Sequence, residues 1–393
     1  MNYDRYINPD IAAVPPSGIR RFFDIAATMK DAISLGVGEP DFVTPYHIRN
    51  AAINSITDGE TQYTGNRGTP ELLEEISWYL EHRYGTKYNP KTEIMVTVGA
   101  SEAIDVALRA LISPGDEVLV PEPSYVSYSP SVIFAGGKPV GVVTTAETEF
   151  RLTPEALRAS ITPRTKFLIL PYPNNPTGGI MEKEDLEKIA QVVREKELIV
   201  ISDEIYSELT YGGKQHVSFA AIPGMWDYTI TLNGFSKAFA MTGWRVGYAC
   251  GPEELISVML KIHQYAIMCA PRMGQVAALE ALRSGRMTDY EDVCRMRESY
   301  DRRRRLMVEG FRAMGLDCFE PRGAFYVFPS IKPTGLTSEE FCNRLLKEYK
   351  VACVPGTAFG ACGEGHIRCS YATGIDKLNI ALERMEAFVK SLK

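Results

Sequence analysis

Short apolar runs alternate with helical patterns through the middle of this chain, and this alternation constrains the fold more than any other feature. Helical periodicity fills the intervals at 100–112 and 183–195. Strands that are apolar throughout and separated by helices favour a mostly parallel sheet that is covered on both faces. The runs that predict such strands are residues 93–98, 117–121, 165–171, 198–203, 229–236 and 244–250.

The pattern changes after Pro252. One long helical pattern runs to about Arg283, and a second runs from about Asp289 to Met314. Short strands and two further helices complete the chain, which is typical of a smaller α+β unit. We therefore predict three parts: an N-terminal arm that joins the small domain (residues 1–47), a large domain (48–284) and a small C-terminal domain (285–393).

Charge and composition exclude several classes of function. The net charge of −6 disfavours nucleic acid or an anionic membrane as the main partner. No stretch approaches the ~20 apolar residues of a membrane span, and the first residues resemble no signal peptide. Eight cysteines without a Cys-x-x-Cys pair indicate reduced thiols, and five dispersed histidines predict no metal site. We expect a cytoplasmic protein.

Polar residues follow directly after four of the predicted strands. In open α/β sheets, ligands bind beyond the carboxyl ends of the strands, so these residues are expected to meet in one crevice. They are residues 99–101, the stretch YPNNPTG at 172–178, Asp203 with Tyr206, and Ser236 with Lys237.

The stretch NGFSKAFAMTGWRVGY, residues 233–248, places Lys237 among small and apolar residues. A buried ammonium is costly unless it is paired or used chemically, and a desolvated amine can form a Schiff base with an aldehyde. Arg245 suits a phosphate, which a guanidinium can bind with two parallel hydrogen bonds. Ser101 and Ser236 offer hydroxyls, and the helix after Gly99 offers its N-terminal N–H groups. The structural alternatives are a surface lysine and an ordinary ion pair.

A second set of residues suits an aromatic ring. Asp203 either caps the next helix or holds a ring nitrogen protonated, because an opposite charge raises the pKa of that nitrogen. Asn175 and Tyr206 could hydrogen-bond a phenolic oxygen on the same ring, and Tyr125 could stack on its face. Together with an aldehyde for Lys237 and a phosphate, these features describe pyridoxal 5′-phosphate.

The ordered motifs of the chain resemble those of the class I/II aminotransferases, which are pyridoxal-phosphate enzymes of fold type I. The resemblance implies an α/β fold with a mostly parallel seven-stranded sheet between helices. It covers nearly the whole chain through the motifs SLGVGEPDF, YTGNRGTPELLEEI, TVGASEAI, YPNNPTG, SDEIYSELTY, SKAFAMTGWRVGY, GAFYVFP and IRCSYA.

The resemblance also implies a role for individual residues. It makes Lys237 the lysine of the internal aldimine and places Asp203 on the pyridine nitrogen, with Asn175 and Tyr206 on the ring oxygen. Tyr125 would stack on the ring. The implied phosphate ligands are Ala100, Ser101, Ser236 and Arg245, with Tyr63 reaching the phosphate from the other subunit of a homodimer. The implied substrate contacts are Arg368 on the α-carboxylate, together with Gly38 and Asn175.

The implied reaction moves an amino group from an L-amino acid to a 2-oxo acid in a ping-pong cycle, with Lys237 as the general base. Ser101 stands where some aspartate-preferring relatives carry a lysine for the distal carboxylate, and the absence of this lysine disfavours a strict preference for aspartate. Tyr63, Tyr125 and Phe325 leave room for a large apolar side chain. An aromatic or aspartate-like amino donor is therefore slightly favoured, while N-acetylated and branched donors stay open.

Two other functions remain alternatives at this point. A carbon–sulfur lyase on the same fold would share Lys237, Asp203 and Arg368 but would eliminate from Cβ. A transcription regulator with an aminotransferase-like domain would need an appended DNA-binding domain of about 60 residues, which the ~45 residues before the sheet do not supply. The run of four arginines at 302–305 predicts a solvated helix face.

Overall fold

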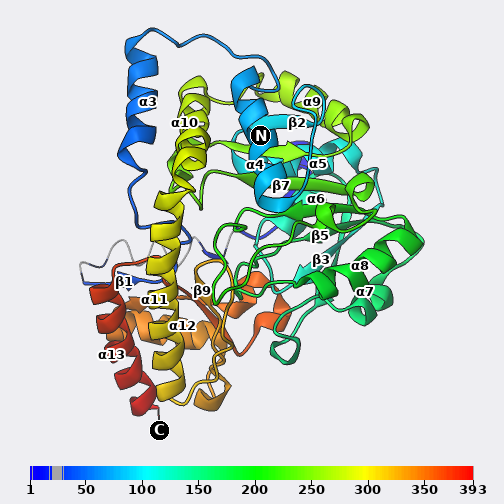
Figure 1. Ribbon diagram of the computed structural model, residues 1–393. Helices are drawn as coiled ribbons and strands as arrows, with labels where there is room; N and C mark the ends of the chain where they lie inside the picture. The colour runs from blue at the N-terminus through cyan, green and yellow to red at the C-terminus, as the bar shows by residue number, and fades with distance from the viewer. Residues whose placement is uncertain (2, 17, 20–28, 30, 393) are drawn as a thin grey trace.

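The computed structural model describes residues 1, 3–16, 18, 19, 29 and 31–392 (Figure 1). Its centre is a seven-stranded sheet in which β8 alone runs antiparallel to its neighbours, so the predicted fold class is confirmed. The order of strands is β2 (Ile94–Thr97), β8 (Gly247–Cys250), β7 (Thr229–Gly234), β6 (Ile199–Asp203), β5 (Thr165–Leu170), β3 (Glu117–Glu122) and β4 (Lys138–Val143).

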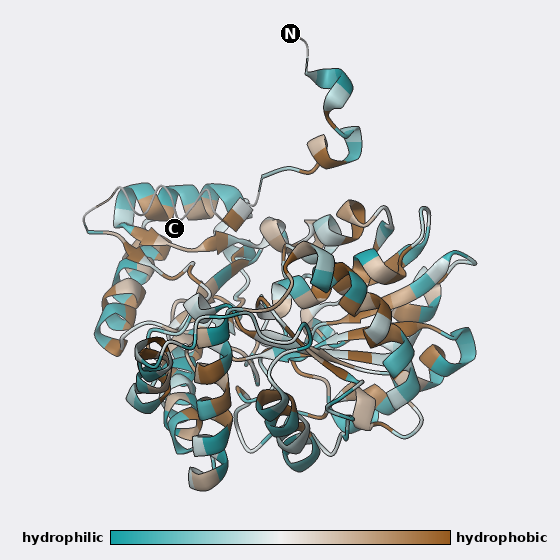
Figure 2. Cartoon of the chain, turned by 90° about the horizontal axis from the view of Figure 1, so that it is seen from above, coloured by the Kyte–Doolittle hydropathy of each residue, from teal (hydrophilic) through white to brown (hydrophobic). Residues whose placement is uncertain are grey.

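Helices cover both faces of this sheet. Ile169 of β5 packs in one hydrophobic cluster with α5 (Gly99–Leu111), α6 (Tyr128–Phe134) and α9 (Glu253–Ala266). The neighbouring Leu168 packs in another cluster with α7 (Pro154–Ser160) and α8 (Lys183–Lys196). Successive residues of a strand point to opposite faces, so both faces are buried, as the apolar runs predict. Figure 2 shows the hydrophobic residues gathered in the strands and on the inner sides of the helices.

A third cluster joins α3 (Tyr46–Thr57), α4 (Pro70–Tyr84) and α10 (Arg272–Thr288) to side chains of β2 and β8 and to Phe235, which follows β7. From α10 the chain passes into α11 (Glu291–Ala313), the long helix that leads into the C-terminal part. None of the helices in the described part of the chain has the length and apolarity needed to cross a bilayer.

The C-terminal elements gather below the central sheet in the view of Figure 1. They form an antiparallel sheet in the order β11 (Val354–Pro355), β12 (Ile367–Ser370) and β9 (Tyr326–Val327), flanked by α12 (Ser338–Tyr349) and α13 (Ile375–Ser391). From the N-terminal part of the chain, β1 (Ile33–Ser34) pairs in parallel with β10 (Val351–Ala352). This pairing agrees with an arm that joins the small domain, although the boundaries at residues 47 and 284 stay predictions.

The structure differs from the sequence-based expectations in three elements. The single long helix predicted after Pro252 is two helices, because Met268 takes a φ of +74° and Pro271 precedes α10. Strand β8 begins at Gly247 and not at residue 244, since Arg245 is left-handed with a φ of +55°. Strand β4 lies at the edge of the sheet, and its sequence KPVGVV gave no strand signal because it contains Pro and Gly.

The prediction of a solvated arginine face is wrong for two of the four arginines. Arg303 is buried and its Nη1 lies 2.7 Å from Asp41 Oδ1, which connects α11 to the N-terminal part of the chain. Arg304 is also buried, and it donates to Asp301 and to Glu320. The two side chains are retained inside because each has a carboxylate partner.

Candidate active site

A cavity of about 590 Å³ lies at the carboxyl ends of the central strands. The four predicted strand ends contribute to it, as do the segment after β3 and residues of the C-terminal part. Eleven of the predicted site residues line it: Gly38, Ala100, Ser101, Tyr125, Asn175, Asp203, Tyr206, Ser236, Lys237, Arg245 and Arg368.

Lys237 follows β7 and points its amine into this cavity. Its Nζ donates to the carbonyl oxygen of Gly38 over 2.7 Å and lies 5.8 Å from the ring centroid of Tyr206. Burial lowers the pKa of this amine to about 8; the charge of Glu39 opposes the shift, and the charge of Arg368 reinforces it. The amine is therefore available in its unprotonated, nucleophilic form much nearer to neutral pH than an ordinary lysine.

Asp203 is the last residue of β6 and is buried. Its Oδ2 accepts a hydrogen bond from Tyr128 Oη over 2.8 Å, and its Oδ1 accepts from the N–H of Ile205 over 3.2 Å. Burial raises the pKa of this carboxyl, while the Tyr128 hydrogen bond lowers it. Tyr128 thus helps to keep Asp203 ionised. Sequence analysis missed Tyr128, which lies three residues beyond Tyr125 at the start of α6.

The first turn of α5 and Arg245 also line the cavity. Gly99 has a φ of +73°, and a Cβ at this position would lie 2.5 Å from Nη2 of Arg245. Glycine is therefore required there both by the backbone and by the close approach of the guanidinium. Arg245 also donates from Nη1 to the carbonyl oxygen of Thr242 over 3.0 Å. The guanidinium and the free N–H groups of the helix terminus create a site for an anion.

Arg368 projects from β12 and is buried. Its Nη1 donates to Asn175 Oδ1 over 3.0 Å and its Nη2 donates to the carbonyl oxygen of Gly36. The guanidinium lies 4.6 Å from the ring centroid of Tyr326, and burial lowers its pKa. Within the described residues, its Nε has no hydrogen-bond partner and no carboxylate pairs with it. A buried cation in this state fits an anionic ligand.

Two tyrosines complete the wall beside Lys237. Tyr206 Oη and Tyr326 Oη are 2.8 Å apart, so one of the phenols donates to the other. Tyr326 also explains why position 38 is a glycine. A Cβ at that position would overlap the Tyr326 hydroxyl. Burial raises the pKa of Tyr206 well above its usual value, which keeps the phenol protonated. Sequence analysis missed Tyr326 as well.

The model of the family described as aminotransferase class I and II matches residues 30–385. This chain belongs to that family. Curated relatives include an aspartate aminotransferase of Pyrococcus abyssi, 50% identical over 97% of each chain, and an aromatic-amino-acid aminotransferase 2 of Thermococcus litoralis, 46% identical over 97% of each chain. The crystal structure of an aromatic aminotransferase from Pyrococcus horikoshii superposes with a TM-score of 0.90 at 48% identity, covering 94% of this chain and 99% of that one. The expectation of an aminotransferase is therefore confirmed at the level of the reaction class.

Two residues that the sequence connected with this aminotransferase site do not line its cavity. The side chain of Tyr63 is exposed, with a relative exposure of 78%. Phe325 is fully buried, with its ring centroid 5.4 Å from that of Tyr206, so it supports the site from behind the cavity surface and does not line the space for a substrate. The apolar side chains that do line the cavity include Ile19 and Val126, which carried no recognisable signal in the sequence.

Proposed function

We propose that this aminotransferase holds pyridoxal 5′-phosphate in the cavity at the strand ends and transfers an amino group from an L-amino acid to a 2-oxo acid in two half-reactions of a ping-pong cycle. The observation that carries the proposal is the amine of Lys237, with its pKa lowered to about 8, in a cavity that also holds Asp203 and Arg245. When bound, the cofactor supplies a carbonyl carbon for this amine and a ring that accepts electrons from the substrate Cα.

The residues present fit this cofactor. Lys237 would hold it covalently, and the carboxylate of Asp203, kept ionised by Tyr128, would pair with its ring nitrogen. Tyr206 and Asn175 would bind the ring oxygen, and Tyr125 would cover the ring. The phosphate would be held by Ala100, Ser101, Ser236 and Arg245.

Arg368 is proposed to bind the α-carboxylate of the amino acid. Its guanidinium already has Asn175 and Gly36 as neighbours, so its orientation is fixed before a ligand arrives. A substrate bound there and beside Gly38 would present its Cα to Lys237, whose Nζ donates to the Gly38 carbonyl in the free protein. The neutral Nζ of Lys237 would then take the proton from Cα, as the general base.

The side chain of the amino donor is proposed to be aromatic or aspartate-like. The cavity contains apolar side chains, Ile19 and Val126, beside the hydroxyl of Ser101. Among the described lining residues, the lysine and arginines are Lys237, Arg245 and Arg368, and each already has a proposed role. Relatives named for aspartate and for aromatic amino acids are similarly close to this chain, which agrees with a donor range that includes both.

A homodimer with shared active sites is part of the proposal. Figure 2 shows the first residues of the chain projecting from the body of the molecule. Apolar side chains are exposed on this segment and on α3: Tyr3, Tyr6, Ile7, Ile11, Tyr46, Ile53 and Ile56. Together with exposed Tyr63 they suit burial against a second copy, where Tyr63 would reach the partner's phosphate site. We further propose a cytoplasmic location.

The variant Lys237→Ala tests the assignment of the lysine. Borohydride reduction of the protein loaded with pyridoxal phosphate should fix the cofactor to the peptide that contains Lys237, as seen by mass spectrometry. The variant should carry no fixed cofactor, whereas Lys261→Ala, at an exposed position on α9, should behave as the wild type. Cofactor fixed to a peptide of Lys237→Ala would refute the assignment.

A panel of amino donors with 2-oxoglutarate, pyruvate and oxaloacetate tests the proposed substrates. Transfer from aromatic amino acids and aspartate should exceed transfer from branched or N-acetylated donors. Release of pyruvate from cystathionine without consumption of a 2-oxo acid would instead indicate the lyase reaction.

A further inference from the structure

A second cavity, of about 770 Å³, lies between α4, the segment 207–216 and α11. It shares no lining residue with the candidate active site. The two cavities are nevertheless adjacent along the chain, since Tyr206 lines the first and Ser207 lines the second. Its volume is in the range of cavities that hold small ligands.

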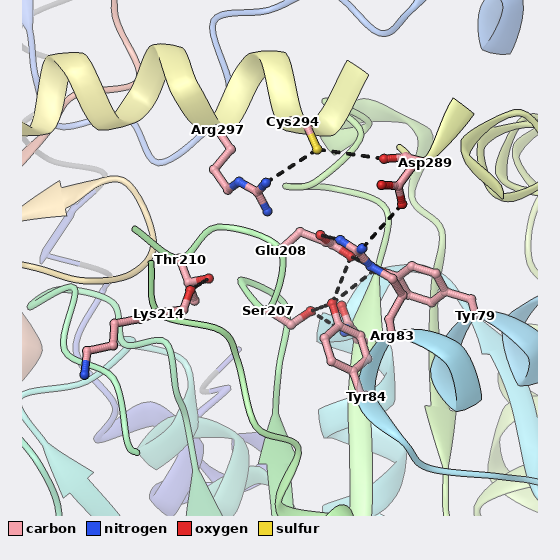
Figure 3. Close-up of polar contacts among 11 residues, drawn as sticks. Tyr79, Arg83, Tyr84, Ser207, Glu208, Thr210, Lys214, Asp289, Cys294 and Arg297 are labelled. Carbon is pink, nitrogen blue, oxygen red and sulfur yellow. Dashed lines mark hydrogen bonds and ion pairs between the residues drawn. The ribbon is translucent and has the colours of Figure 1, made fainter. Parts of the chain in front are cut away.

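The floor of this cavity is a neutralised ion pair (Figure 3). The carboxylate of Glu208 is buried, and Arg83 donates to it from Nε over 2.9 Å and from Nη2 over 2.5 Å. The hydroxyls of Tyr79 and Tyr84 also donate to Glu208, over 2.7 and 3.1 Å. The charge of the Glu208 carboxylate is compensated by the guanidinium of Arg83 and by these hydrogen bonds. This carboxylate therefore repels an anion in the cavity only weakly.

The wall formed by α11 carries cations that lack carboxylate partners. Arg297 donates to the thiol sulfur of Cys294 over 3.4 Å, which is a weak acceptor (Figure 3). Arg302 makes no hydrogen bond or ion pair within the described part of the chain. Asp301, which lies between them, is already bound by Arg304 over 2.8 Å and lies 3.5 Å from Arg305. Two guanidinium groups are therefore free to bind an anion in the cavity.

The other charged groups agree with an anionic ligand. Lys214 reaches the cavity from the facing segment, where its Nζ binds Glu182 over 2.8 Å. Of the two remaining carboxylates, that of Asp289 is 97% exposed, and Glu298 is exposed as well. Solvent weakens the repulsion that these two exposed carboxylates exert on a ligand.

We propose that this cavity binds a small polyanion, with carboxylate or phosphate groups, through Arg297 and Arg302 above the floor of Arg83 and Glu208. The two arginines are five positions apart, a rise of about 7.5 Å along a helix, so a ligand with at least two anionic groups can engage both. Such a ligand would connect α11 to the segment that continues directly from Tyr206.

Calorimetric titration with citrate and with pyrophosphate tests this site. The protein is first saturated with pyridoxal phosphate, so that the anion site around Arg245 is filled, and all titrations are made at one ionic strength. The readout is heat of binding, which does not depend on catalysis. At least one of the two probes is expected to bind, and which one binds distinguishes a carboxylate site from a phosphate site.

The double variant Arg297→Gln/Arg302→Gln should bind that probe at least tenfold more weakly. Arg295→Gln is the matched control, because Arg295 lies on the same helix, pairs with Asp292 and does not line the cavity. Melting curves of both variants should match that of the wild type. Absence of binding by either probe, or equal binding by the double variant and the wild type, would overturn the proposal.

Discussion

In the protein without cofactor, the amine of Lys237 is expected to titrate near pH 8. Burial is the main cause of the lowered pKa, because the ammonium loses solvation in the cavity. The positive charges of Arg368 and Arg245 act in the same direction, and the carboxylate of Glu39 acts against them. The shift makes the amine neutral between about pH 8 and the ordinary value of 10.5, where an exposed lysine is still charged.

The size of the effect follows from these two values. With a pKa of about 8, roughly a quarter of the Lys237 amines are neutral at about pH 7.5. With the ordinary pKa of 10.5, about one amine in a thousand is neutral at the same pH. The structure therefore predicts roughly two hundred times more reactive amine at Lys237 than at an exposed lysine, before any difference in access.

Competitive acetylation at a series of pH values measures this directly. Mass spectrometry gives the labelled fraction of the Lys237 peptide and of exposed Lys261 in the same sample. The labelling rate of Lys237 should level off above about pH 8, while that of Lys261 should still rise toward pH 10. Glu39→Gln should move the midpoint of Lys237 lower, and Glu254→Gln, outside the cavity, should leave it unchanged. A Lys237 rate that parallels that of Lys261 would show that burial does not set this pKa.

Three further variants probe the supports of the two cavities. Gly99→Ala should lower the melting temperature, because an alanine in the left-handed conformation costs about 1–2 kcal/mol. The same variant should bind the cofactor at least tenfold more weakly, because the new Cβ would displace the guanidinium of Arg245. Tyr128→Phe should raise the pKa of Asp203, so the acidic limb of a plot of cofactor affinity against pH should move to higher pH. Arg83→Met should lower the free energy of unfolding in urea by about 3–5 kcal/mol, because it leaves the Glu208 carboxylate buried without its cation. The double variant Arg83→Met/Glu208→Leu should regain most of that free energy.

Strand direction alone predicted several residues that line the candidate site, and the family resemblance supplied others such as Gly38 and Arg368. Asp203 ends β6 and Lys237 follows β7, so both were recognised as residues at the carboxyl ends of apolar strands. Gly99 was recognised as the start of a helix that offers free N–H groups, and the structure shows that the Arg245 guanidinium lies close to it. These inferences needed only local pattern and strand direction.

The missed residues depend on tertiary contacts that local pattern does not contain. Tyr128 reaches Asp203 across 75 residues of sequence, and Tyr326 reaches Tyr206 across 120. A tyrosine in either segment is equally consistent with ordinary core packing. Phe325 shows the converse case, since it is adjacent to Tyr326 in sequence but is buried and does not line the cavity. The alternation of side chains along a strand can distinguish Phe325 from Tyr326 only when the strand and its buried face are known.

The buried arginines of this protein differ in whether a carboxylate compensates their charge. Arg303 and Arg304 are buried, and each contacts a carboxylate, so their charges are already compensated in the fold. Arg368 is equally buried, but its polar neighbours are an amide oxygen and a carbonyl oxygen. A buried guanidinium without a carboxylate costs folding free energy, which a bound anion offsets. The family resemblance implies a ligand for Arg368, and the absence of a carboxylate partner agrees with the proposal that it binds one.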